Sequence, residues 1–243
     1  MAAINIAMWS GPRNLSTAMM RAFENRPDTT VWDEPFYAAY LWHTGLDHPM
    51  RDAVMAAGET DWRRVAARCA SAPADGGVCY QKHMTHHMLR DFGTDWMVAL
   101  EHGFLLRHPA RVLRSYVAKR EQVALADIGV VQQWELFCAV RDRLGTAPLV
   151  VDSDDFLIEP RAYLERMCTR WGLAFSERML SWPSGARASD GAWAPHWYGS
   201  VWQTTGFGAP RPPVDERLPD ALQRVCDEAM PYYDKLAREK LTV

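Results

Sequence analysis

The chain has 243 residues, of which 48% are hydrophobic, and its formal net charge at pH 7 is −3. This hydrophobic share suffices for a sizeable core and argues against wholesale disorder, and the length suits one α/β domain or two small ones. A slightly acidic chain without a long run of like charge is not typical of a general nucleic-acid binder, so we expect no nucleic-acid partner. Any anionic ligand must be held by locally placed Arg, Lys and backbone N–H groups.

The five cysteines indicate a reducing compartment. Their number is odd and no C-x-x-C pair occurs, which fits reduced thiols in a cytosol better than a disulfide framework or a zinc site. The first apolar run is short and stops at Gly11, so it predicts a buried strand rather than a signal peptide. No stretch approaches the roughly 18 apolar residues that a membrane span requires. We therefore expect a cytoplasmic protein without a membrane span.

Strands and helices are predicted to alternate along the chain. The expected strands are residues 4–9, 29–32, 78–81, 103–106 and 149–151. The expected helices are residues 16–26, 51–70, about 109–121, 130–144 and about 216–239, with a His-rich helical stretch between the third strand and Arg90. Such alternation predicts a three-layer α/β/α sandwich with a central parallel sheet, of the P-loop nucleotide-binding type.

The late part of the chain has an unusual composition. Residues 181–214 are rich in Gly, Pro and Trp, and we expect them to form a long ordered loop before the C-terminal helix. Its tryptophans favour an aromatic-lined pocket or lid, with ordinary core packing as the alternative. Because the sequence contains neither an internal repeat nor a linker, we predict a single domain over residues 1–243.

The first strand leads directly into a turn and a helix. In this order the freed N–H groups and the positive end of the helix dipole point at one place, which predicts an anion site. Arg13 adds a full charge, and two hydroxyl groups add donors. The residues of this predicted site are Gly11, Pro12, Arg13, Asn14, Leu15, Ser16 and Thr17.

A nucleoside-triphosphate loop fits the turn less well. The usual pattern is G-x-x-x-x-G-K-[ST]. Here Ser16 takes the position of the second Gly and Thr17 that of the Lys. Asp33 and Asp152 are the remaining candidates for a Mg²⁺ ligand. A kinase or other phosphotransferase therefore stays an alternative that predicts Mg²⁺ dependence.

A second basic segment follows the fourth expected strand. Arg107 leaves that strand, and Ser115 follows eight positions later on a predicted helix. Arg111 and Ser115 share one helical face, so this segment has the residues to bind a phosphate that the first turn does not reach. Taken alone, this segment is better explained as an amphipathic helix with solvated arginines.

Together the two segments resemble the sulfotransferase family that uses 3′-phosphoadenosine 5′-phosphosulfate (PAPS). Residues 12–17 are similar to its P-K-S-G-T-T signature, with Arg13 in place of Lys, and Arg107 with Ser115 is similar to its R-x₇-S signature. The resemblance implies that the first segment binds the 5′-phosphosulfate and the second the 3′-phosphate. Gly191 and Trp193 resemble the family's late G-x-W element, with Arg187 as a companion.

The chain also departs from the family pattern. Leu15 replaces the loop glycine, so the turn must differ in detail. Ala18 stands where cytosolic members often have a Trp that stacks on adenine. Arg13 keeps the charge of the usual Lys but not its compact ammonium.

The resemblance implies in-line sulfuryl transfer, in which positioning and charge stabilisation dominate. Arg13 and Lys82 are the expected stabilising cations, and no metal is expected. An alcohol acceptor needs a base: Glu34 follows the second strand and His83 the third, and members of the family use a Glu or a His there. His86 and His87 are candidates to face the substrate.

The resulting prediction is a PAPS-dependent sulfotransferase that releases 3′,5′-adenosine bisphosphate and acts on a hydroxyl or amine of a small acceptor. The sequence does not name the acceptor, and it leaves a homodimer open. Besides a phosphotransferase, the second alternative is a non-catalytic nucleotide-binding protein that keeps both phosphate sites.

Overall fold

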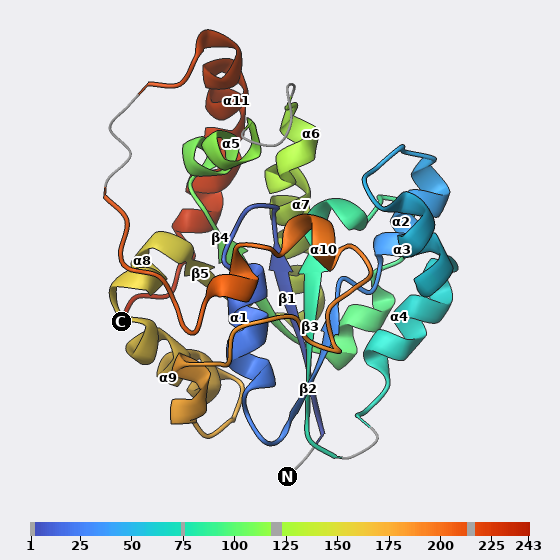
Figure 1. Ribbon diagram of the computed structural model, residues 1–243, viewed down its shortest axis with the longest axis vertical. Helices are drawn as coiled ribbons and strands as arrows, with labels where there is room; N and C mark the ends of the chain where they lie inside the picture. Colours follow the sequence, from blue (N-terminus) through green and yellow to red (C-terminus); the bar gives the residue numbers. More distant parts are fainter. Residues whose placement is uncertain (1–2, 74–75, 118–122, 213–216) are drawn as a thin grey trace.

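The computed structural model describes residues 3–73, 76–117, 123–212 and 217–243, and a parallel β-sheet lies at its centre (Figure 1). The strands are β1 (Ile4–Ser10), β2 (Thr29–Asp33), β3 (Val78–Met84), β4 (Glu101–Leu106) and β5 (Leu149–Asp152). They are arranged in the order β2-β3-β1-β4-β5, and every neighbouring pair is parallel. The predicted parallel α/β sheet is confirmed.

Helices cover both faces of the sheet. They are α1 (Ser16–Glu24), α2 (Tyr37–Thr44), α3 (Arg51–Ala57), α4 (Trp62–Ala70), α5 (Pro109–Val117), α6 (Leu125–Ile128), α7 (Val130–Leu144), α8 (Ser153–Ile158), α9 (Pro160–Arg170), α10 (Ala194–Trp197) and α11 (Asp220–Ala237). Four 3₁₀ turns, at Thr85–His87, Asp95–Ala99, Glu177–Leu180 and Val201–Gln203, complete the described elements.

Alternation of side chains along the strands explains the three layers. Ile6 and Met8 of β1 are buried in one core with α1 and α9, whereas Ala7 and Trp9 are buried in the other with α4 and α7. Successive residues of a strand point to opposite faces, so a strand that is apolar throughout requires cover on both sides.

Two predicted elements differ in kind from the structure, and helix α2 was not predicted. The helix expected over residues 51–70 is two helices, separated at Gly58, where a Cβ atom would come within 2.5 Å of the Cβ of Ala38. The His-rich stretch is not a helix, because β3 stays paired with β1 as far as Met84 and one 3₁₀ turn follows. The predicted end of the 109–121 helix and residues 213–214 of the late loop lie outside the described residues.

The described part of the late segment, residues 181–212, contains short helices. A bridge joins Ser181 to Gly206, and Trp182 and Trp193 are buried in the core on the α1 side. In Figure 1 its orange helix, α10, lies beside the carboxyl ends of β1 and β3. This edge of the sheet is where open α/β sheets bind their ligands.

Candidate active site

A cavity of about 410 Å³ lies at the carboxyl ends of β1, β2 and β3. The turn after β1 lines one side, Glu34 and Lys82 line its floor, and the late segment contributes Trp197 and Tyr198. Arg107 and Ser115 also line it, so the two basic segments predicted from the sequence open onto the same space.

The turn after β1 has a shape that depends on two residues. A Cβ atom at Gly11 would come within 2.6 Å of the carbonyl oxygen of Ile128, so only glycine allows α6 to lie this close. Gly11 itself does not line the large cavity. Arg13 adopts a left-handed conformation with φ of 56°, whereas Leu15 has φ of −78°. Because the left-handed residue is Arg13, position 15 needs no glycine, which accounts for the departure from the family loop.

Asn14 fixes the turn to the sheet. Its Nδ2 donates a hydrogen bond to the carbonyl of Leu105 at 2.9 Å, and its Oδ1 accepts one from the N–H of Leu15 at 2.7 Å. Ser16 and Thr17 begin α1 beside the cavity, and no side chain caps this helix. The first N–H groups of a helix lack partners within it, so here they are available to an anion.

The second basic segment meets the first. Nε of Arg13 donates to Oγ of Ser115 at 3.0 Å, and the guanidinium of Arg107 donates to the carbonyl of Arg13. Nε of Arg107 is buried and has no hydrogen-bond partner among the described residues. Two guanidinium groups, an unsatisfied N–H and a hydroxyl therefore gather at one side of the cavity, a set that fits a phosphate.

Lys82 lies at the centre of a buried network. Its ammonium donates to Oδ1 of Asp33 at 3.0 Å, to the hydroxyl of Tyr198 at 2.8 Å and to the carboxylate of Glu34. Burial alone would lower the pKa of Lys82, but Asp33 and Glu34 outweigh it and hold this pKa well above its usual range. An ammonium has three N–H donors, and all three are used inside the protein. Lys82 thus stabilises Glu34, with no N–H left over for a donor molecule.

Glu34 occupies the junction of this network and the cavity. Its backbone has φ of 42°, and its N–H donates to the carbonyl of Lys82 at 2.8 Å. The side chain is 10% exposed, and Oε2 lies 3.9 Å from Nδ1 of His87. Burial raises the pKa of Glu34 above its ordinary value, although the charge of Lys82 opposes this shift. Backbone strain at two cavity residues, Arg13 and Glu34, is typical of functional sites.

His83 points away from the cavity, which corrects its prediction as an alternative base. Lys82 and His83 are adjacent on β3, so their side chains face opposite sides of the sheet. The ring of His83 stacks on Trp9 at 4.4 Å and contacts Gln81 at 3.1 Å. Burial lowers the pKa of His83 well below its ordinary value. His83 is therefore a neutral core residue.

His86 and His87 line the cavity instead. The ring of His87 stacks on Tyr37 at 4.4 Å, and the hydroxyl of Tyr37 hydrogen-bonds to His48. Burial lowers the pKa of His87 well below its ordinary value, so this ring is neutral at pH 7. Tyr37 of α2 forms an aromatic wall of the cavity, opposite the basic segments, together with His86 and His87 of the 3₁₀ turn that follows β3.

The late G-x-W element does not reach the turn after β1. Arg187 donates to the carbonyl of Pro183 and lies 4.0 Å from Glu24. Gly191 and Trp193 line a second cavity instead. The three residues predicted to assist nucleotide binding are thus separate from the basic cluster.

Sequence reasoning missed two members of the network. Tyr198 donates to both carboxylate oxygens of Asp33, at 2.8 and 2.9 Å, and accepts from Nε1 of Trp193 at 3.2 Å. No local pattern marks Tyr198, because its partners come from β2 and β3. The place of Asp33 in the network could have been inferred from the sequence. Asp33 and Glu34 are consecutive carboxylates at the end of β2, which is the neighbour of the strand that carries Lys82.

Among the described residues, no group of three or more His, Cys, Asp or Glu side chains is placed to hold a metal ion. No helix in the described part of the chain is long and apolar enough to cross a membrane.

Comparison with known proteins identifies the family. A curated relative, "Branched-chain-amino-acid aminotransferase-like protein 1" of Arabidopsis thaliana, is 32% identical over 231 residues, which are 95% of this chain and 41% of that protein. The sulfotransferase domain of the Synechococcus PCC 7002 olefin synthase has a similar fold, with a TM-score of 0.55 and 18% identity over 98% of this chain and 96% of that one. A sulfotransferase from Alicyclobacillus acidocaldarius gives a TM-score of 0.53 and 11% identity over 99% and 98%. A family model described as "Sulfotransferase domain" matches residues 4–239, and the chain therefore belongs to this family.

Proposed function

We propose that the protein transfers a sulfuryl group from PAPS to a hydroxyl or amine of a small acceptor. The observation that carries this proposal is the meeting of both basic segments, through the contact of Arg13 with Ser115, in a cavity whose floor holds Glu34. The acceptor oxygen attacks sulfur, the bond from sulfur to the 5′-phosphate oxygen breaks, and 3′,5′-adenosine bisphosphate leaves. The proton of the acceptor passes to Glu34.

The nucleotide would be bound in two places. The N–H groups at the start of α1, with Ser16 and Thr17, suit the 5′-phosphosulfate. Arg107 and Ser115 suit the 3′-phosphate, and the unsatisfied Nε of Arg107 supports this role. Arg13 starts in the first segment and reaches the second, so it would neutralise charge near both groups. Because these cations are supplied by the protein, the proposed transfer needs no metal.

Glu34 is the proposed base. Its raised pKa makes it a better proton acceptor than an exposed carboxylate. Lys82 orients the carboxylate of Glu34 through a hydrogen bond to Oε1, and Oε2 lies on the side of His87. The aromatic wall of Tyr37 and His87 would then receive the body of the acceptor.

The name of the Arabidopsis relative contains the word "aminotransferase-like". Aminotransferases use a neutral lysine to form a Schiff base. Among the described residues, Lys82 is the one lysine that lines the cavity. Its raised pKa and its three hydrogen bonds keep it protonated, which argues against that chemistry here. A cytoplasmic location, a single domain and a homodimer remain predictions.

The direct experiment is transfer of radiolabelled sulfate from PAPS to fractions of a small-molecule extract, with EDTA present. We expect label in at least one acceptor fraction with the wild-type protein, and loss of that label with Glu34→Gln. Label that depends on added Mg²⁺, or that is unchanged in Glu34→Gln, contradicts the proposed mechanism.

A further inference from the structure

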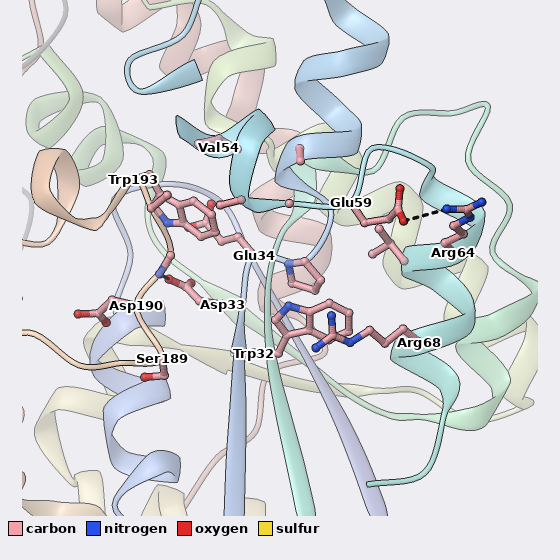
Figure 2. A pocket seen from close by; sticks show the side chains of 17 residues that line it. Trp32, Asp33, Glu34, Val54, Glu59, Arg64, Arg68, Ser189, Asp190 and Trp193 are labelled. Atoms are coloured by element: carbon pink, nitrogen blue, oxygen red, sulfur yellow. Dashed lines mark hydrogen bonds and ion pairs between the residues drawn. The ribbon is translucent and has the colours of Figure 1, made fainter. Parts of the chain in front are cut away.

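A second cavity, of about 380 Å³, lies on the outer side of the edge strand β2. Helices α2, α3 and α4 form one side of it, and residues 189–193 of the late segment form the other (Figure 2). Glu34 is the one described residue that lines both this cavity and the large one. Nothing in the proposed transfer uses this second space.

The walls of the second cavity combine apolar and polar side chains in about equal measure. Val54 and Val65 are buried, and Pro35, Ala38 and Trp193 add further carbon surface. In Figure 2 the indoles of Trp32 and Trp193 stand at different sides of the space. Concave sites that combine apolar side chains with placed polar groups are typical of small-molecule binding.

Four acidic residues line the cavity, and each has a basic partner, although Asp33 and Glu34 share the single ammonium of Lys82. Asp33 is paired with Lys82, and Asp190 is paired with Arg21 and accepts from Nε1 of Trp202 at 3.0 Å. Glu59 lies 3.6 Å from Arg64, the pair joined by the dashed line in Figure 2.

Arg68 differs from these groups. Its guanidinium carbon lies 4.1 Å above the centre of the Trp32 ring, and no ion pair joins it to a carboxylate in the described part of the chain. Stacking on an indole fixes the guanidinium plane while its N–H edge stays available. Figure 2 shows Arg68 reaching from α4 across to Trp32. The cavity thus has one exposed cation that is positioned by Trp32 and forms no ion pair in the described part of the chain.

We propose that the second cavity binds an organic monoanion with an apolar body. Its carboxylate or sulfate group would contact Arg68, and its hydrocarbon or ring would lie between Trp32, Val54 and Trp193. This site does not depend on the proposed transfer reaction. The second cavity is nevertheless connected to the buried network of Lys82. The N–H of Gly191 donates to Asp33 at 3.2 Å, and Trp193 donates to Tyr198.

The test is calorimetric titration with octyl sulfate and, separately, octanoate, both below their micellar concentrations. Saturating 3′,5′-adenosine bisphosphate is present to occupy the large cavity. Octyltrimethylammonium is the charge control, with the same chain and the opposite charge. We expect at least one of the two anions to bind, and the cation to bind at least tenfold more weakly. Comparing octyl sulfate with octanoate identifies the preferred head group.

Three variants locate the binding. Arg68→Gln is expected to weaken anion binding at least tenfold, because a charge-assisted contact is lost. Arg63→Gln is the matched control, since Arg63 on the same helix stacks over Trp62 at 4.6 Å and does not line the cavity. Ala57→Trp, at an exposed position of the cavity wall, should block the space without disturbing the core.

The proposal is overturned if neither anion binds, if the cation binds equally well, or if Arg68→Gln and Arg63→Gln have the same affinity. Retained binding in Ala57→Trp also overturns it. Bisphosphate affinity, measured in each variant, reports that the fold is intact.

Discussion

Replacement of Lys82 by methionine tests the buried network most severely. Methionine keeps a similar volume, so the change removes the charge and the three N–H donors with little loss of packing. Asp33 and Glu34 then remain as two buried carboxylates without their shared cation. Breaking a buried ion pair by removal of one partner costs about 3–5 kcal/mol.

This loss corresponds to a large shift in melting temperature. For a chain of this size, each kcal/mol lowers Tm by about 2–4 °C, so we expect Lys82→Met to melt roughly 6–20 °C below the wild type. The double variant with Asp33→Asn removes one of the two stranded charges. It should be less destabilised than the sum of the single changes, because residues in one network do not contribute additively.

The effect of pH gives a second readout with a defined sign. Burial raises the pKa of Glu34, and without Lys82 the main interaction that opposes this shift is lost. A carboxyl with a raised folded-state pKa binds its proton more tightly when folded, so stability is gained as pH falls towards its unfolded pKa and lost as pH rises through its folded pKa. The deficit of Lys82→Met should therefore shrink between about pH 8 and about pH 5.

The assay is urea unfolding followed by tryptophan fluorescence, with thermal melts at both pH values. A loss smaller than about 1 kcal/mol would refute a buried, fully paired Lys82. So would a deficit that widens as pH falls.

Three further predictions concern activity and binding. Glu34→Gln should lower kcat about 10²–10⁴-fold with bisphosphate affinity nearly intact, whereas His83→Asn should leave kcat per folded molecule unchanged; the reverse result in steady-state assays would exchange their roles. Arg107→Ala and Ser115→Ala should each weaken bisphosphate binding by about 1.5–3 kcal/mol, with little effect on 5′-AMP; equal losses for both ligands would place the 3′-phosphate elsewhere. In a pH–rate profile, activity should fall on the acid side at a pKa above that of an ordinary Glu, and a limb at the ordinary value would show that the base is more exposed than Glu34.

The order of strand, turn and helix over residues 4–24 could be predicted because local geometry decides it. A strand, a polar turn and a helix start need no distant residue to point their N–H groups at one place. Arg107, which directly follows β4, and Ser115 on α5 could likewise be paired by their spacing. Their contact with Arg13 depends on β1 and β4 being neighbours, which the sequence did not specify.

The error at His83 has a physical cause. The third strand was predicted to end at residue 81, and the histidines after it were read as helical, so the alternation of side chains was not applied to Lys82 and His83. The structure extends β3 to Met84, and alternation then sends these two side chains to opposite faces. Tyr198 could not be predicted in the same way, because it lies 116 positions from Lys82.

The central claim is that the cavity recognises a nucleotide with a 3′-phosphate. Isothermal titration of the wild-type protein with 3′,5′-adenosine bisphosphate and with 5′-AMP, in EDTA, tests it most directly. Binding of the bisphosphate at least tenfold tighter than that of 5′-AMP, without Mg²⁺, is the predicted result, since one charge-assisted contact is worth about 1.5–3 kcal/mol. Equal affinity for the two ligands would contradict the account.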